Sequence, residues 1–128
     1  MTACELTIRE GWTRDLFRNA PLTEIFNAAA LELPLTIVPW RDGDSMQPLG
    51  APGTRKLKAL FRDRGIPVPL RRQIPVVHDT QGPIWVAGIS MAARVRVQND
   101  SRKLIRLSWE APASMLPYLS VGAQEKAL

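Results

Sequence analysis

Proline is the residue type that most constrains how this chain can fold. Eleven prolines are spread along its 128 residues. A proline inside a helix removes a backbone hydrogen bond and clashes with the preceding turn, so helices in such a chain are few and short. The pattern excludes an all-helical fold and predicts that strands and turns fill most of the space between the prolines.

The length indicates one domain with a substantial core, because chains of this size bury roughly two-thirds of the surface that they expose when unfolded. No apolar run approaches the roughly 20 residues that a membrane-spanning helix needs, so we expect no membrane partner. The N-terminal residues lack the basic and then apolar order of a secretory signal, and the single cysteine, Cys4, cannot form an internal disulfide. We therefore expect a cytoplasmic protein.

Positive charge is concentrated in one part of the chain. Residues 1–40 hold three arginines against five carboxylates, whereas residues 41–75 hold eight lysines and arginines against three aspartates. A basic segment of this density favours an anionic partner, and nucleic acid first, because each neutralised phosphate releases condensed counterions. The charge alone is equally consistent with a solvated surface.

The segment "TRKLKALFRDRG", residues 54–65, carries the clearest helical pattern. Its apolar residues Leu57, Leu60 and Phe61 recur at helical spacing on one face, and the basic residues Arg55, Lys58 and Arg62 fall on the other. Thr54 is a suitable N-cap and Gly65 a suitable C-terminal stop. We expect an amphipathic helix with an apolar side for the core and a basic side for a partner.

Most of the remaining chain is typical of strands and turns. The proline-rich stretch 66–75 is expected to be an irregular connection that displays Arg71 and Arg72. A helical turn is expected at residues 27–31. Strands are expected at residues 5–9, at 21–26, at 33–40 as a buried strand, in a hairpin of 74–79 and 83–88, at 94–97 with Arg94 and Arg96 on one face, and at 103–107.

The segment "RDGDSMQPLG", residues 41–50, raises the question of whether Ser45 is a nucleophile. Its Ser-Met-x-Pro order resembles the serine loop of signal-peptidase-like and repressor-cleaving proteases, in which a lysine activates the serine. Such a lysine must be desolvated to act as a base. Lys56, Lys58 and Lys103 all lie in charged surroundings, so the sequence argues against this chemistry.

Other common catalytic and metal sites find little support. His78 is the only histidine and Cys4 the only cysteine, which excludes a Cys/His zinc site within the chain. The sequence has no Walker loop, no GxGxxG motif and no Ser-Gly-Gly nucleotide loop. We expect neither a metal nor a cofactor to be bound.

A set of short motifs resembles the C-terminal domain of tRNA(Ile)-lysidine synthetase. The match extends over roughly residues 22–109, and its length makes it more specific than any single motif. The residues that carry the resemblance are Gly43-Asp44, Pro48-Leu49-Gly50, Gly53, Arg55-Lys56-Leu57-Lys58, Phe61, Ile66-Pro67, Arg71, Pro75 and Trp85-Val86-Ala87-Gly88.

The resemblance implies a tRNA-binding module that grips the acceptor stem. In the family an ATP-using catalytic domain with a Ser-Gly-Gly loop lies N-terminal to this module, and no such domain is present in this sequence. The chain is then either the C-terminal part of a synthetase or a free-standing relative that works with a separate catalytic domain. Three positions depart from the family pattern: Val38 and Ser45 stand where arginine is common, and Asn27 where aspartate is usual.

These observations predict an α+β fold, mostly strands in a sheet-like or sandwich-like arrangement, with one principal amphipathic helix at about residues 54–64. The family-like domain is expected at residues 22–110, after a segment of unknown role at 1–21 and before a weakly ordered tail at 111–128. We expect tRNA binding without catalysis in this chain; the alternatives are a Ser/Lys hydrolase centred on Ser45 and a structural or protein-interaction domain. The candidate RNA-binding residues are Arg41, Arg55, Lys56, Lys58, Arg62, Arg71 and Arg72.

Overall fold

The computed structural model describes residues 3–10 and 22–119 of the chain, and these are mostly strands with a few short helices. The expected α+β class is therefore confirmed. The strands are β1 (Ala3–Glu10), β2 (Thr23–Asn27), β3 (Thr36–Val38), β4 (Ser45–Met46), β5 (Arg55–Lys56), β6 (Val76–Asp79), β7 (Gly82–Val86), β8 (Ser90–Met91) and β9 (Lys103–Glu110). The helices are α1 (Leu57–Asp63) and α2 (Val68–Arg71), with 3-10 helices η2 (Ala28–Ala30), η3 (Ala93–Val95) and η4 (Ala113–Tyr118).

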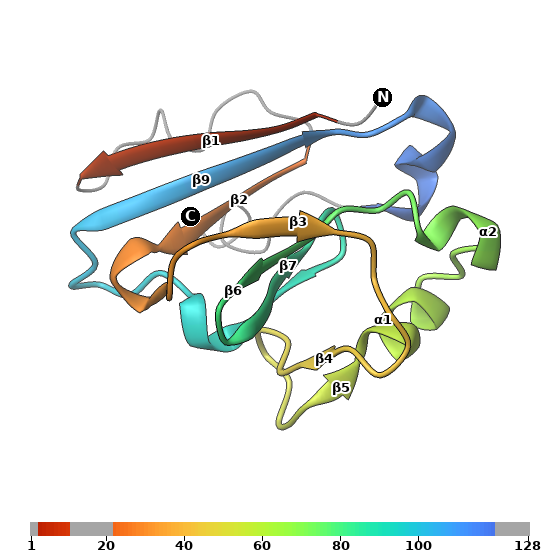
Figure 1. The fold of residues 1–128 in the computed structure, drawn as a ribbon, viewed down its shortest axis with the longest axis horizontal. Helices are drawn as coiled ribbons and strands as arrows, with labels where there is room; N and C mark the ends of the chain where they lie inside the picture. Colours follow the sequence, from red (N-terminus) through yellow and green to blue (C-terminus); the bar gives the residue numbers. More distant parts are fainter. Residues whose placement is uncertain (1–2, 11–21, 120–128) are drawn as a thin grey trace.

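The described strands form three antiparallel groups. The first sheet has the order β1-β9-β2, the second has the order β3-β6-β7-β8, and β4 pairs with β5 alone. Figure 1 shows the first sheet as one layer, with the second sheet beneath it and α1, β4 and β5 on the far side. The second sheet is thus the middle layer of the molecule.

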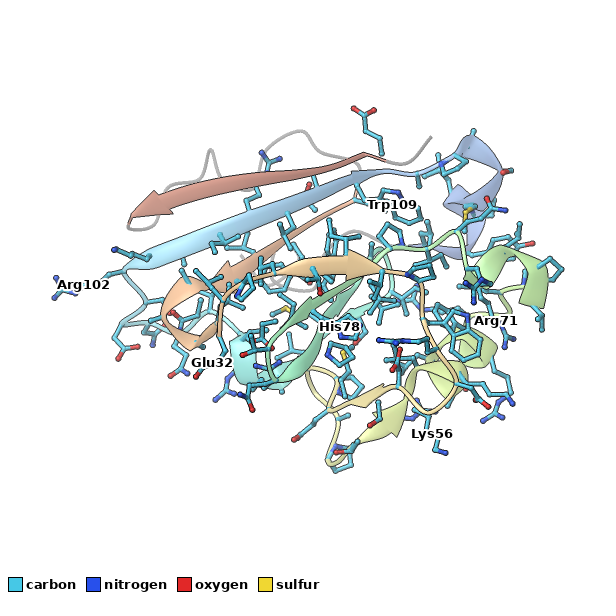
Figure 2. The ribbon with its side chains drawn as sticks, viewed as in Figure 1. Glu32, Lys56, Arg71, His78, Arg102 and Trp109 are labelled. Carbon is cyan, nitrogen blue, oxygen red and sulfur yellow. The ribbon has the colours of Figure 1, made fainter. Side chains whose placement is uncertain are left out.

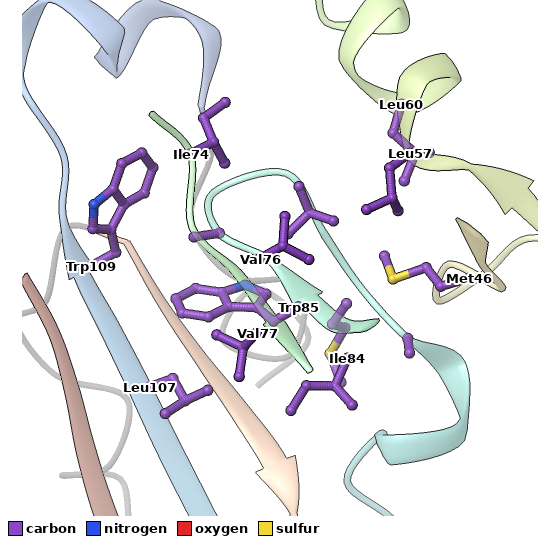
Figure 3. Packing of buried hydrophobic residues seen from close by; sticks show 14 of the residues in the cluster. Met46, Leu57, Leu60, Ile74, Val76, Val77, Ile84, Trp85, Leu107 and Trp109 are labelled. Atoms are coloured by element: carbon purple, nitrogen blue, oxygen red, sulfur yellow. The ribbon is translucent and has the colours of Figure 1, made fainter. Parts of the chain in front are cut away.

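The hydrophobic core fills the space on both sides of that middle layer. Trp109 and Leu107 of β9 lie on one side of β6 and β7, whereas Leu57 and Met46 lie on the other (Figure 3). The core residues predicted from the helical pattern, together with Trp85, belong to this one buried cluster. The amphipathic assignment of the helix is therefore correct.

The helix begins later than the sequence indicated. Its first residue is Leu57, because Arg55 and Lys56 are paired with Met46 and Ser45 as strand β5. Thr54 is therefore not the N-cap, and the position is held by Lys56 without a side-chain hydrogen bond. The expected stop at Gly65 is confirmed, since its φ is 67° and its N–H donates to the Arg62 carbonyl.

The expectation of a buried strand over residues 33–40 was wrong. Only Thr36–Val38 form a strand, and Leu33 and Ile37 are 66% and 53% exposed. In the described part of the fold β3 pairs with β6 alone, so it is an edge strand and has no neighbouring strand on its other side. The prolines on either side carry no N–H and limit its pairing to three residues.

Two further local predictions were wrong. The stretch 66–75 contains the short helix α2, because Pro69 lies in its first turn, where a missing N–H breaks no intrahelical hydrogen bond. Residues 94–97 do not form a strand: η3 takes up Ala93–Val95, so Arg94 and Arg96 do not share a strand face. The expected helical turn after residue 27, the hairpin of β6 and β7, and the strand that begins at Lys103 are confirmed.

The segments outside the expected domain contribute to the structure where it describes them. Strand β1 lies within residues 1–21, as the alternation at residues 5–9 indicated, and it pairs with β9 along its whole length. Residues 11–21 and 120–128 lie outside the described residues. In the region expected to be a tail, η4 places Met115 in the core with no exposed surface.

An ion pair with a buried carboxylate joins three separate segments. The Asp79 side chain at the end of β6 has no exposed surface, and it accepts hydrogen bonds from both terminal nitrogens of Arg94 at 2.8 and 2.6 Å. It also accepts from the backbone N–H groups of Glu32 and Gln81. Asp79 therefore connects the chain before β3, the turn between β6 and β7, and helix η3.

Candidate nucleic-acid interface

Helix α1 presents two cations on the side away from the core. Lys58 and Arg62 are exposed and lie four residues apart, so their side chains are neighbours on one helix face. The buried residues Leu57, Leu60 and Phe61 hold the opposite face against the second sheet. The same pattern that builds the core thus leaves a pair of charges free to meet a partner.

Three more of the predicted cations are exposed. They lie on the segments next to α1 in the chain or in space: Arg41 before β4, Lys56 at the end of β5 and Arg72 after α2. Within residues 3–10 and 22–119, the side chains of Arg41, Lys56, Lys58, Arg62 and Arg72 form no hydrogen bond or ion pair. Lys56 lies at the α1 end of the molecule, far from Arg102 at the opposite end (Figure 2).

The two remaining predicted residues have protein partners. Arg71 is half-buried: its Nε donates to the Ile66 carbonyl at 2.9 Å, and its guanidinium lies over the Phe61 ring at 6.0 Å from the centroid. Arg55 is not on the helix, and it forms an ion pair with Asp63 at 2.7 Å. The expected line of Arg55, Lys58 and Arg62 on one helix face is therefore reduced to Lys58 and Arg62.

Two residues that the sequence patterns did not single out help to shape this surface. Trp40 is half-buried, and its ring meets Phe61 edge-on with centroids 5.5 Å apart. Arg64 follows α1 and donates to the carbonyls of Ile89 and Tyr118, which ties the end of the helix to the turn after β7 and to η4. The position of Trp40 directly before a charged turn could have indicated from the sequence that it lies beside this surface. No local pattern indicated which groups Arg64 bonds to.

The three positions that depart from the family pattern have different structural surroundings. Asn27 caps η2, and its side-chain oxygen accepts from the Ala29 N–H at 3.2 Å, a role that aspartate can also fill. Val38 ends the edge strand β3 and is half-buried. Ser45 begins β4, directly across from Lys56. Only the last two positions change the number of positive charges.

The surroundings of Ser45 do not suit nucleophilic catalysis. Its strand partner Lys56 is exposed, whereas a lysine that acts as a base needs apolar surroundings. His78 is half-buried on β6, where burial lowers its pKa below 6.5, Asp44 opposes that shift and Arg41 adds to it. The part of the chain that is described contains no group of three His, Cys, Asp or Glu side chains suited to a metal ion.

We expect Ser45→Ala to leave the protein unchanged. Surface and half-buried substitutions away from special features alter the free energy of unfolding by less than about 0.5 kcal/mol. Thermal unfolding and RNA titration of the variant should match those of the wild type, and serine-directed acylating probes should not label the chain. Stoichiometric labelling of Ser45 in the wild type would instead support the hydrolase alternative.

Among the described helices, none is long and apolar enough to span a lipid bilayer.

Comparison with known sequences gives one consistent result. The family model of the TilS substrate C-terminal domain matches residues 35–109. The tRNA(Ile)-lysidine synthase of Geobacter sulfurreducens is 35% identical over 79 residues, which cover 62% of this chain and 17% of that protein. The corresponding synthase of Caldanaerobacter subterraneus is 30% identical over 95 residues, which cover 74% of this chain and 20% of that protein. The chain thus spans about a fifth of the length of these relatives.

Comparison with solved structures agrees. The crystal structure of a TilS C-terminal domain superimposes with a TM-score of 0.72 and 29% sequence identity, covering 86% of this chain and 84% of the other. An N-terminal fragment of the phenylalanyl-tRNA synthetase β-subunit from Pyrococcus horikoshii superimposes with a TM-score of 0.67. The two sequences are 14% identical, and the superposition covers 87% of this chain and 40% of that fragment. This second likeness therefore concerns the fold alone.

Proposed function

Because the chain belongs to the family of TilS substrate C-terminal domains, we propose that it is a tRNA-binding module that contacts the acceptor stem of its tRNA. The observation that carries the proposal is the set of exposed cations on and beside α1. Lys58 and Arg62 form its centre, and Arg41, Lys56 and Arg72 extend it. Since none of the five side chains has a partner among the described residues, all five are available to a ligand.

The arrangement of these cations suits a phosphate backbone. Lys58 and Arg62 are separated by one helical turn, about 6 Å along the axis, so they can meet neighbouring anionic groups on one strand. An A-form RNA helix hides its base edges in a deep and narrow groove, so a protein recognises it mainly by shape and backbone. Contacts of this kind position the RNA without reading its sequence.

Phe61 and Arg71 support the surface from beneath. The ring of Phe61 is buried against Trp40, and the Arg71 guanidinium over it is held by the Ile66 carbonyl. A guanidinium fixed in this way retains further N–H groups that can donate to phosphate. We therefore assign Arg71 to the binding surface as a positioned contact beside the five exposed cations.

We propose that this chain does not carry out lysidine formation and that another domain of the enzyme does. The matched segments make up only 17% and 20% of two of the relatives. We propose that a separate or upstream ATP-binding domain supplies catalysis. This chain then contributes affinity and position for the tRNA, without a cofactor of its own. A module with this role works in the cytoplasm, where its tRNA is found.

RNA titration over a range of salt concentrations tests the proposal. We expect a hairpin that reproduces a tRNA acceptor stem to bind more tightly than a single-stranded RNA of equal length. The logarithm of its binding constant, plotted against the logarithm of the salt concentration, should fall with a slope of about 0.7–0.9 for each phosphate neutralised. Lys58→Ala and Arg62→Ala should each make this slope less steep by about one, because each variant neutralises one phosphate fewer.

Arg102→Ala is the matched control, because Arg102 is an exposed cation at the opposite end of the molecule (Figure 2). It should change the overall charge equally and leave the salt dependence close to that of the wild type. Equal affinities for the two RNAs, or α1 variants that bind as well as the wild type, would contradict the proposal. The chain would then be better described as a protein-interaction domain.

A further inference from the structure

We propose that Asp63 acts as an intramolecular competitor for RNA: it holds the Arg55 guanidinium, and an RNA phosphate replaces the carboxylate when the surface is occupied. This inference rests on the proposed function of α1 and its neighbours. It concerns how tightly that surface binds, and it assigns a purpose to the one predicted cation that the structure finds in an ion pair.

The geometry places the Arg55–Asp63 pair on the proposed surface. Arg55 lies in β5 immediately before α1, and Asp63 is the last residue of the helix. Their charged groups are 2.7 Å apart, so the Arg55 side chain runs alongside the helix to its final turn. Asp63 follows Arg62 directly in the chain, and the two side chains of the pair remain 40% and 51% exposed. A ligand can therefore reach both of them.

The position of Asp63 is not explained by helix stability. The C-terminal turn of a helix carries partial negative charge, which disfavours an acidic side chain there and favours a basic one. An ion pair between exposed groups contributes little to folding, because both charges are already well hydrated. The fold thus gains little from Asp63, and its main effect is on the charge that Arg55 presents.

A phosphate can replace this carboxylate without loss of geometry. A guanidinium donates paired N–H groups to phosphate oxygens as it does to carboxylate oxygens. Because the Arg55–Asp63 pair is weak, its exchange for a phosphate is feasible, and the energy of breaking it is subtracted from the binding energy. The pair consequently limits the affinity of the surface for any polyanion that uses Arg55.

Asp63→Asn tests this inference, since it keeps the size of the side chain and removes its charge. We expect the variant to bind the acceptor-stem hairpin about two- to fivefold more tightly at low salt, the factor expected for release of an exposed ion pair. In an Arg55→Ala background the same substitution should lose this gain. Thermal unfolding should show that all variants remain folded.

Asp100→Asn controls for the change in net charge. Asp100 is exposed in the turn two residues before Arg102, and Arg102 lies at the other end of the molecule from Lys56 (Figure 2). The inference requires Asp63→Asn to tighten binding more than Asp100→Asn, and only when Arg55 is present. Equal effects of the two substitutions, or the same gain with and without Arg55, would overturn it.

The two proposals fail in distinguishable ways. If Lys58→Ala weakens hairpin binding while Asp63 and Arg55 show no coupling, the competitor role falls and the RNA-binding role stands. If the wild type does not prefer the hairpin, or if the Lys58 variant binds it as well as the wild type does, the proposed function is contradicted and this inference is contradicted with it.

Discussion

Phe61→Ala is expected to lower the free energy of unfolding by about 3–5 kcal/mol, the usual effect of truncating a large aromatic side chain in a core. Phe61 has no exposed surface and belongs to the main hydrophobic cluster. Its ring meets Trp40 and supports the Arg71 guanidinium, so its removal opens a cavity directly beneath the proposed binding surface. Chemical denaturation monitored by tryptophan fluorescence measures the loss.

Phe61→Leu provides the control, because it retains most of the apolar volume and should be less destabilising. If the surface depends on this support, the alanine variant should also bind the acceptor-stem hairpin more weakly at temperatures where it remains folded. An alanine variant as stable as the wild type would show that Phe61 does not pack as described.

Arg94→Ala is expected to lower the free energy of unfolding by about 3 kcal/mol, at the lower end of the range for breaking a buried ion pair. Within the described part of the chain, the substitution leaves the fully buried Asp79 carboxylate with two donors, the backbone N–H groups of Glu32 and Gln81. The loss is placed at the lower end because the Arg94 side chain is itself 38% exposed. Arg96→Ala is the matched control, since Arg96 is exposed and, among the described residues, its side chain donates to the nearby Ala93 carbonyl alone.

The pH dependence of stability provides an independent check on this pair. Burial raises the pKa of Asp79, but hydrogen bonds from Arg94, Glu32 and Gln81 outweigh it and lower the pKa from 3.8 to about 2. A carboxyl whose pKa is depressed on folding adds stability above the pKa of the unfolded state, and that stability is lost as the pH falls toward the folded value. About 2.5 kcal/mol should therefore be lost progressively between about pH 5 and pH 1, most of it between about pH 4 and pH 2.

Arg94→Ala should reduce this acid-dependent loss, because the largest interaction that lowers the Asp79 pKa is then absent. Denaturation at a series of pH values between 2 and 6 measures the difference between the wild type and the variant. Identical acid dependence of the two proteins would show that the ion pair is not the source of the shift.

Local pattern alone predicted the features whose causes lie along the chain. The apolar spacing of Leu57, Leu60 and Phe61 defined the buried face of α1, and Gly65 defined its end. Turn residues between two apolar runs defined the hairpin of β6 and β7. Motifs spread over residues 22–109 were sufficient to identify the family, because they depend on residue identity and spacing and not on which segments meet in space.

The tertiary structure decided the features whose causes lie far apart in the chain. An apolar segment is buried or exposed according to its place in a sheet, and β3 is exposed because it lies at an edge. A charged side chain is available to a partner only if the fold does not place an opposite charge beside it. Asp63 forms an ion pair with Arg55, and Asp79 forms one with Arg94, which lies fifteen residues away in the chain. The amino-acid sequence thus determined the family, the core face of the helix and the concentration of positive charge, whereas only the packing of distant segments determined which of those charges a partner can reach.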